Sequence, residues 1–343
     1  ALIEDIRIHA PSVHGRKIQS IFLGGGTPSL LSPRSVDRIL NACAQYLALS
    51  DQIEITLEAN PGRAEQQRFR GFLDAGVNRL SIGIQSFNDA SLHALGRVHS
   101  SEEAHQAVMA ARAAGCDNLN LDMMFGLPQQ TVTQAMQDLD KLIAHRPDHI
   151  SYYQLTIEPN TRFFKHPPKL TEPDTCFDLH EAAMEKLDKH GYQRYEVSAF
   201  SQTNKQCLHN LNYWLFGDYL GIGAGAHGKL TDSKTGLVTR SHAKKLPASY
   251  MKADRDCNEH LIVDKPLNEQ DRVFEFMLNA LRLTQGFPVE LFEDRAQVAW
   301  SFAEPTVEKG IALGWLCYAH ERLCPTSLGY RHLNDTISLF LPE

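Results

Sequence analysis

Five short apolar runs, each followed by a helical pattern, constrain the fold of this chain more than any other feature. They lie about 25 to 40 residues apart, at SIFLGG (20–25), EITLEAN (54–60), RLSIGIQS (79–86), NLNLDMMFG (118–126) and HISYYQLT (149–156). Parallel strands need crossover helices and are covered on both faces, so they read as continuous apolar runs. The sequence therefore predicts an α/β fold with a parallel sheet. Five units are too few for a closed eight-stranded barrel and fit an open or partial one.

Start signals support the helices of this alternating pattern. Ser32 is placed as an N-cap with Pro33 at the first helical position, and capping boxes are predicted at 100–103 (Ser and Glu) and 131–134 (Thr and Gln). Further helical patterns cover roughly 64–75 and 173–190.

Polar side chains gather where each predicted strand ends. They are Thr27, Glu58, Asn60, Gln85, Ser86, Asp122, Gln154 and Thr156. In parallel α/β folds the ligand lies beyond the carboxyl ends of the strands. The pattern predicts one site at one rim of the sheet.

Bulk composition excludes several classes of protein. The 343 residues carry a net charge of −7, which gives no basic surface for a nucleic acid. No apolar stretch approaches the roughly 18 residues of a membrane span, and no signal peptide is visible. We expect a cytoplasmic protein that neither binds nucleic acid nor spans a membrane.

The chain is long enough for more than one domain. We predict a barrel domain at 1–200, a barrel-closing loop and strand segment at 201–263, and a small helix-rich, winged-helix-like domain at 264–343. The last range holds seven Lys and Arg against twelve Asp and Glu. A DNA-reading wing should be basic, so we interpret this domain as structural or as a docking module.

Two motifs are interpreted conservatively. The seven cysteines show no CxxC spacing, so we expect them to be reduced and mostly buried. GAGAHG (223–228) satisfies the GxGxxG pattern of dinucleotide sites, but a polar turn follows it and no βαβ unit surrounds it. We interpret it as a glycine-rich strand and turn closing the barrel.

The glycine run in IFLGGGTPSLLSP (21–33) is the most unusual loop of the first half. A simple strand-to-helix turn is the alternative, but three consecutive glycines exceed what such a turn requires. Glycines without Cβ atoms let a ligand approach the backbone closely. The run therefore predicts a ligand-binding loop.

Taken together in order, several motifs resemble the oxygen-independent coproporphyrinogen III oxidase group of radical SAM proteins, and within it the haem-chaperone branch called HemW. The motifs are FLGGGTPSLLSP, LEANPG, GIQSF, LGRVH, NLDMMFGLPQQT, YYQLTIEPNT and HNLNYWLFGDYLGIGAGAHG. The resemblance implies a partial (β/α)6 barrel that binds S-adenosylmethionine (SAM) and a 4Fe–4S cluster. In that family a CxxxCxxC loop after the first strand ligates three irons, and SAM occupies the fourth.

The sequence departs from this family at the cluster. It contains no CxxxCxxC loop, so no metal ligand is assigned in this chain. Either a first strand and cluster loop precede Ala1, or the protein is a paralogue without a cluster. A start without Met, within a helical pattern, favours the first explanation.

By resemblance, ten residues are candidates for SAM binding: Gly24, Gly25, Gly26, Thr27, Glu58, Gln85, Arg97, Asp122, Thr156 and His227. The glycine loop would meet the methionine end of SAM, Glu58 would accept hydrogen bonds from the ribose hydroxyls, and Arg97 could pair with a carboxylate. A structural ion pair at Asp122 and a core position for His227 are the alternatives.

The segment HNLNYW (209–214) marks the haem-chaperone branch. His209, Asn210, Tyr213 and Trp214 are its candidates for haem binding, because imidazole is a common axial ligand of haem iron and aromatic rings pack on the macrocycle. Cys207 is a weaker rival ligand, and His209 and Trp214 could instead fasten the chain.

The resemblance favours a haem chaperone that passes haem to an unidentified acceptor protein, with a small electron-transfer protein as a further partner. The alternative is an oxygen-independent coproporphyrinogen III dehydrogenase that decarboxylates two propionates. A third hypothesis is a binding module of the SAM fold that has lost its cluster. The sequence leaves open whether the protein is an enzyme.

Overall fold

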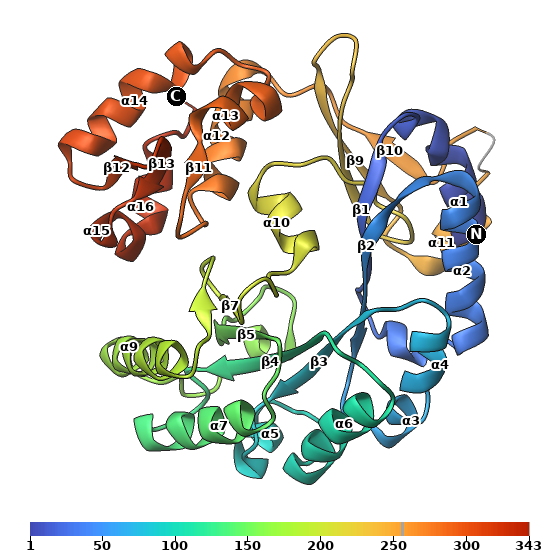
Figure 1. Ribbon diagram of the computed structural model, residues 1–343, viewed down its shortest axis with the longest axis vertical. Helices are drawn as coiled ribbons and strands as arrows, with labels where there is room; N and C mark the ends of the chain where they lie inside the picture. The colour runs from blue at the N-terminus through green and yellow to red at the C-terminus, as the bar shows by residue number, and fades with distance from the viewer. Residues whose placement is uncertain (255–256, 343) are drawn as a thin grey trace. The chain divides into compact units, whose positions relative to one another are not determined.

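The computed structural model describes residues 1–254 and 257–342, which form two compact units (Figure 1). We call residues 19–40 and 52–207 the sheet unit. Residues 1–18, 41–51 and those from Leu208 onward are the terminal unit.

A curved seven-stranded sheet with the order β1-β2-β3-β4-β5-β7-β6 dominates the first half of the chain (Figure 1). Its strands are β1 (Lys17–Leu23), β2 (Ala48–Ala59), β3 (Arg79–Gln85), β4 (Leu119–Phe125), β5 (His149–Gln154), β6 (Gln193–Arg194) and β7 (Ala199–Ser201). Strands β2 to β5 pair in parallel, whereas β7 runs antiparallel to β5 and to β6. All five predicted apolar runs are strands, and the predicted α/β half-barrel is confirmed.

Helices connect the strands and line the outer side of the curve (Figure 1). They are α2 (Pro33–Tyr46), α3 (Arg63–Gln66), α4 (Phe69–Asp74), α5 (Asp89–Ala94), α6 (Ser101–Ala113), α7 (Val132–Ala144), α8 (Arg162–Lys165) and α9 (Pro173–Lys189), with a short 3₁₀ turn at Pro28–Leu30. Both predicted capping boxes form, at the starts of α6 and α7. The side chain of Ser32 accepts a hydrogen bond from the Ser35 N–H at the start of α2.

The core of the sheet unit lies between the strands and these helices. Leu80, Ile82, Leu119 and Leu121 of the central strands are fully buried with apolar side chains of α6, α7 and α9. Each such side chain contributes about 1.5–3 kcal/mol by leaving water. This packing fixes the strands whose carboxyl ends form the rim.

The terminal unit contains α1 (Leu2–His9) and two small antiparallel sheets. The first sheet is made of β8 (His227–Thr231), β9 (Val238–Ala243) and β10 (Leu261–Val263), and the second of β11 (Phe287–Pro288), β12 (Leu316–Ala319) and β13 (Arg322–Pro325). The helices beside them are α10 (Leu208–Trp214), α11 (Pro247–Lys252), α12 (Glu269–Ala280), α13 (Val289–Ala296), α14 (Trp300–Ala312), α15 (Ser327–Arg331) and α16 (Leu333–Ser338), with a 3₁₀ turn at Ala10–Val13.

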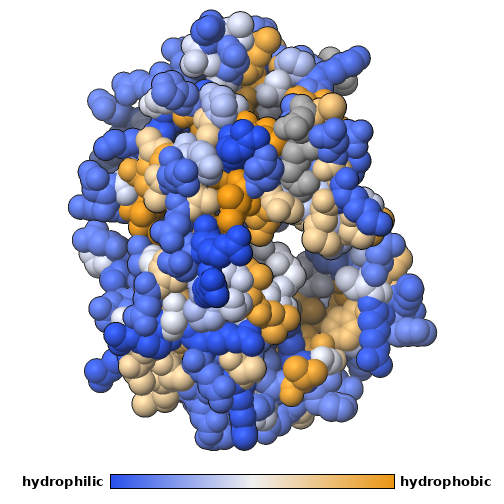
Figure 2. Space-filling view, turned by 90° about the vertical axis from the view of Figure 1, so that its right-hand side faces the viewer, coloured by the Kyte–Doolittle hydropathy of each residue, from blue (hydrophilic) through white to orange (hydrophobic). Residues whose placement is uncertain are grey.

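The helix-rich C-terminal region has its own core. Phe276, Phe287 and Phe292 are fully buried and pack edge to face, with ring centroids 4.9 and 5.1 Å apart. A three-stranded sheet surrounded by short helices fits the predicted winged-helix-like region. The face drawn in Figure 2 is mostly hydrophilic, with apolar side chains in a few groups.

The predicted loop and strand segment at 201–263 also contains the helices α10 and α11. The strand expected to close the barrel at GAGAHG instead pairs with β9 in a separate sheet. Between β8 and β9, the Asp232 carboxylate accepts hydrogen bonds from the N–H groups of Lys234 and Thr235, which fixes a tight turn. The three-part domain division stays a prediction.

Among the described residues, none of the helices combines the length and the apolarity needed to cross a membrane.

Candidate functional site

A pocket at the carboxyl ends of β2, β3 and β4 brings most of the predicted site together. The cavity has a volume of about 170 Å³. Ten residues, all in the sheet unit, line it: Gly26, Thr27, Pro28, Glu58, Ala59, Asn60, Ser81, Gly83, Gln85 and Asp122. We call it the rim pocket. Its volume is below the 300 Å³ or so of a whole small-molecule site, so it can hold part of a larger ligand.

The glycine loop after β1 is shaped for close approach. Gly25 and Gly26 have φ angles of +76° and +64°, which side chains rarely adopt. A Cβ on Gly24 would lie 2.6 Å from the Phe22 ring and 3.2 Å from the Glu58 carboxyl carbon. The Gly25 N–H donates a hydrogen bond to Glu58 Oε2 at 3.2 Å. The loop and Glu58 therefore form one structural element.

The rim pocket is acidic. Burial raises the pKa of Glu58 despite the bond from Gly25, and the nearby Asp122 adds to the shift. Burial also raises the pKa of Asp122. Since none of the ten lining residues is basic, the potential in the pocket favours a cationic ligand. The carboxylate oxygens can also accept hydrogen bonds from hydroxyl groups.

Gln85 ends β3 in a strained conformation. Its φ of +69° accompanies an irregularity in the β3–β4 pairing, and its side chain is 4% exposed. The Tyr153 hydroxyl donates to Gln85 Oε1 at 2.7 Å, and a Cβ on Gly83 would lie 3.0 Å from Gln85 Nε2. Burial, with a contribution from Asp122, raises the pKa of Tyr153 to about 12, so this donor keeps its proton at neutral pH. Strain of this kind persists where the surroundings hold a side chain in place.

Asp122 rests on a buried polar network. Asn120 Nδ2 donates to Asp122 Oδ1 and to Ser81 Oγ, both at 2.7 Å. The Asn120 Oδ1 atom can only accept, so His149 Nδ1, 2.6 Å away, carries the proton of that ring. His149 Nε2 then accepts from the Tyr195 hydroxyl at 2.8 Å.

The protonation of His149 agrees with this assignment. Burial, with the Arg79 charge second, holds the pKa of His149 well below its usual value, so the ring is neutral. The network therefore fixes the position of the Asp122 carboxylate without a direct ion pair. In place of the alternative interpretation, a structural ion pair with an arginine, the structure shows only a longer-range electrostatic interaction with Arg79.

Five of the ten predicted SAM residues lie outside the lining of the rim pocket, and two of them, Gly24 and Gly25, belong to the glycine loop described above. Arg97 is exposed just after α5, and Thr156 is exposed just after β5. His227 begins β8 in the terminal unit, where its exposed ring stacks on His242 of β9 with centroids 5.7 Å apart. It is therefore not a core histidine.

Ser81 and Gly83 line the rim pocket but are not among the site residues predicted from the sequence. The two-residue period of a strand places both on the same face as Gln85. The register of the sheet places residues of β2 and β4 beside this face of β3, since Glu58 pairs with Ser81 and Ser81 pairs with Asn120. Alternation along RLSIGIQ was the signal that could have found them.

The cysteines do not fit a 4Fe–4S cluster. Five of the seven are buried, Cys317 is half-buried and Cys257 is exposed. Across residues 1–254 and 257–342, the one grouping with the geometry of a metal site contains no cysteine. The cysteines of the described residues therefore assign no ligand to a 4Fe–4S cluster.

The HNLNYW segment forms most of α10 in the terminal unit. His209 and Tyr213, one turn apart, are both half-buried and meet edge to face with centroids 4.9 Å apart. Tyr213 meets Tyr219 in the same way at 4.5 Å. Burial, with Tyr219 second, raises the pKa of Tyr213 to about 12.

Other residues fasten this segment. The Arg282 guanidinium lies 4.4 Å from the centre of the Trp214 ring. Asn212 Nδ2 donates to the Asp218 carbonyl, and Asp218 pairs with the buried Lys229 at 2.9 Å. Asn210 is half-buried on the same helix, whereas Cys207 is buried and its thiol donates to Glu54. Asn212, Trp214 and Asp218 are therefore among the residues that anchor α10.

Comparisons with known proteins agree over the whole chain. Residues 2–142 match the radical SAM superfamily, and residues 267–332 match the HemN C-terminal domain. The chain is 44% identical to the heme chaperone HemW of Haemophilus influenzae, over 99% of this chain and 87% of that protein. It is 40% identical to the heme chaperone HemW of Escherichia coli, over 100% of this chain and 89% of that protein.

A solved structure shows the same fold. The coproporphyrinogen III oxidase HemN of Escherichia coli, described as a radical SAM enzyme, superposes with a TM-score of 0.80 over 99% of this chain and 81% of that chain. The two sequences are 20% identical, so this likeness concerns the fold.

Proposed function

Because this chain belongs to the HemW family of the radical SAM superfamily, we propose that it is a haem chaperone, which binds haem and passes it to an acceptor protein. The observation that carries the proposal is the 44% identity to a heme chaperone over 99% of the chain. The match extends through the HNLNYW helix as well as the sheet unit.

We propose that haem binds at α10. A half-buried imidazole with two successive aromatic rings supplies a ligand for iron and an apolar surface for the macrocycle. His209 is the proposed axial ligand and Tyr213 the proposed packing surface. Asn210 and Trp214 complete the proposed haem segment, and the stacking of Trp214 on Arg282 supports a role in orienting α10.

We propose that the rim pocket binds part of SAM. The radical SAM match implies both SAM and a 4Fe–4S cluster for the family. SAM brings a sulfonium cation and ribose hydroxyls, which suit an acidic pocket rich in hydrogen-bond acceptors. In this proposal Glu58 binds the ribose, Gly24 to Thr27 cradle the methionine end, and Asp122 and Gln85 complete the wall.

Arg97, Thr156 and His227 stay proposed SAM residues with less support, since none of them lines the rim pocket. The coproporphyrinogen III dehydrogenase hypothesis has the shared fold in its favour, and nothing at the site favours it over the chaperone.

Haem titration of the whole protein tests the proposal. We expect binding of one equivalent with a shift of the Soret band, and His209→Ala should weaken the affinity at least about tenfold, the loss of one good ligand bond. His93→Ala, a change of the same kind at an exposed histidine of α5, should bind haem like the wild type.

Two results would overturn the proposal. One is the absence of a Soret shift in the wild type, and the other is conversion of coproporphyrinogen III by the SAM-loaded protein, which would favour the dehydrogenase. Equal haem affinity of His209→Ala and His93→Ala would remove His209 as the ligand.

A further inference from the structure

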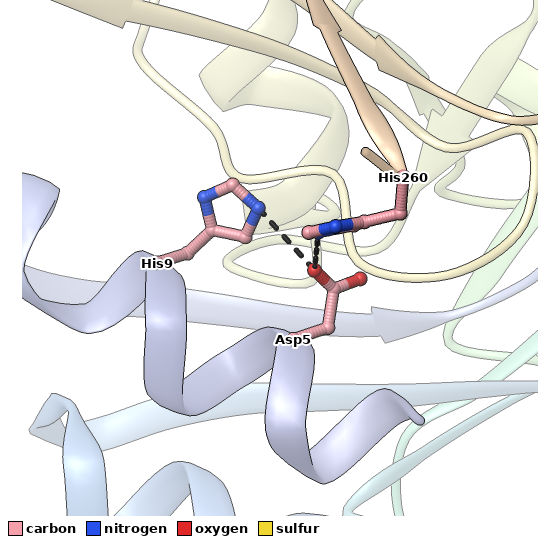
Figure 3. Close-up of side chains that lie close together, drawn as sticks. All are labelled: Asp5, His9 and His260. Atoms are coloured by element: carbon pink, nitrogen blue, oxygen red, sulfur yellow. Dashed lines mark hydrogen bonds and ion pairs between the residues drawn. The ribbon is translucent and has the colours of Figure 1, made fainter. Parts of the chain in front are cut away.

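Two histidines and one aspartate of the terminal unit meet at a single point (Figure 3). Asp5 and His9 lie one turn apart on α1, and His260 directly precedes β10. His260 Nε2 lies 2.8 Å from Asp5 Oδ1, and His9 Nε2 lies 3.3 Å from the same oxygen. We call these three residues the α1 cluster. None of its residues belongs to the rim pocket or to α10.

The second oxygen of Asp5 is held by other groups. Oδ2 accepts hydrogen bonds from the Tyr250 hydroxyl and, at 3.1 Å, from the Gly223 N–H. These two donors fix the plane of the carboxylate and direct Oδ1 toward the histidines. Partners of this kind commonly orient a carboxylate that ligates a metal ion.

His9 supplies an unused ligand atom. Its Nε2 is buried and makes no hydrogen bond of good geometry within the described part of the chain, although 13% of its side chain is exposed. His260 is fully buried. The 3.3 Å between His9 Nε2 and Asp5 Oδ1 is longer than the 2.8 Å between His260 Nε2 and the same oxygen, which leaves room for an ion to bind between the His9 ring and the carboxylate.

The spacing matches the coordination sphere of one ion. Two ligand atoms about 2.0 Å from a zinc ion in tetrahedral geometry lie about 3.3 Å apart. The 3.3 Å between His9 Nε2 and Asp5 Oδ1 equals this spacing, whereas the 2.8 Å between His260 Nε2 and Asp5 Oδ1 is the shorter spacing of a hydrogen bond. All ligand atoms of the cluster lie within 4.8 Å of one another. Two imidazole nitrogens and one carboxylate oxygen fill three positions of a tetrahedral site and leave the fourth position for water.

We propose that Asp5, His9 and His260 bind one divalent transition-metal ion, with zinc as the best fit to two nitrogens and one oxygen. The ring nitrogens bind in their neutral form, so binding at Nε2 places the proton of each ring on Nδ1. The ion joins α1 to the chain before β10, across 255 residues of sequence, and stabilises the terminal unit.

Zinc binding by His9→Gln, compared with the wild type, tests the site. His9 is suitable because it makes no hydrogen bond of good geometry that its loss would break. His14→Gln, at an exposed histidine directly after the 3₁₀ turn Ala10–Val13, is the matched control. The whole protein is used, with weakly bound metal removed by dialysis.

We expect one equivalent of zinc in the wild type and in His14→Gln, and at least about a tenfold lower affinity in His9→Gln. Zinc should raise the melting temperature of the first two proteins and leave that of His9→Gln unchanged. X-ray absorption at the zinc edge should show nitrogen and oxygen neighbours only.

Equal zinc binding by all three proteins would overturn the proposal, as would sulfur neighbours in the absorption spectrum, because the ion would then be bound by cysteine. A wild type that binds no zinc would reduce the α1 cluster to a hydrogen-bonded structural network. None of these results bears on haem binding at α10.

Discussion

The rim pocket and the α1 cluster are each built around a buried aspartate, and the two carboxylates are perturbed in opposite directions. Burial raises the pKa of Asp122, and its neutral hydrogen-bond donors do not compensate. Burial also acts to raise the pKa of Asp5, but the His9 ring, Tyr250, Gly223 and the His260 charge outweigh it and lower the pKa to about 2. Burial alone therefore does not decide the shift; the donors around the oxygens do.

The difference separates two kinds of site. The rim pocket contains the carboxyl groups of Glu58 and Asp122 and no basic residue among the ten that line it, so it favours a positively charged ligand. Asp5 already has donors on both oxygens, which makes it a structural centre of the terminal unit as well as a ligand.

The largest expected effect comes from Asp5→Ala. Removing this carboxylate leaves the Tyr250 hydroxyl, the Gly223 N–H and His260 without their acceptor. We expect the free energy of unfolding to fall by about 3 to 5 kcal/mol, measured by urea denaturation with a chelator present. Glu4→Ala, which breaks an exposed ion pair with Arg7, should cost less than about 1 kcal/mol. Similar losses for both variants would refute the central role of Asp5.

Asp122→Asn, unlike Asp5→Ala, should change ligand binding more than the free energy of unfolding. It removes a charge from the rim pocket while keeping the shape and an acceptor oxygen for the Asn120 amide. We expect SAM to bind about tenfold more weakly, since a charge-assisted contact is lost, whereas the free energy of unfolding at neutral pH stays equal or rises. Calorimetry gives the affinity for SAM, and Glu102→Gln on the exposed face of α6 is the control.

The pH dependence of stability and of SAM affinity tests the role of Asp122 in a second way. A carboxyl whose pKa is raised on folding binds more protons folded than unfolded, so its contribution to stability falls as pH rises from its ordinary value of 3.8 through the raised one. SAM affinity should rise over that window as Asp122 and Glu58 ionise. Asp122→Asn should weaken both slopes, and slopes identical to those of the wild type would contradict the assignment.

The smallest effect is expected at the glycine loop. Gly25→Ala puts a side chain at φ +76° with no atom within 4 Å of the new Cβ, so the cost is backbone strain of about 1–2 kcal/mol. Gly191→Ala, at φ +82° and equally open, should lose similar stability. Only Gly25→Ala should also weaken SAM binding, by up to about tenfold, because its N–H bonds to Glu58. Equal SAM affinity in the two variants would show that the glycine loop takes no part in SAM binding.

Local patterns determined much of the sheet unit. The apolar runs became β1 to β5, and the Ser100–Glu103 and Thr131–Gln134 boxes began α6 and α7, because both signals act within a few residues. Parallel strands end at one edge, so polar residues after successive strands could be assigned to one rim before the structure was known. Glu58, Gln85 and Asp122 confirm that rule by lining one pocket.

Tertiary structure alone decided the rest. That β8 pairs in its own sheet, and that Asp122 rests on Asn120 and His149, depends on which strands become neighbours. The α1 cluster is the extreme case, because Asp5 and His260 carry no mutual spacing signal across 255 residues. A sequence determines periodicity, caps and strand ends through near-neighbour forces, whereas a contact between distant residues exists only once the whole chain has packed.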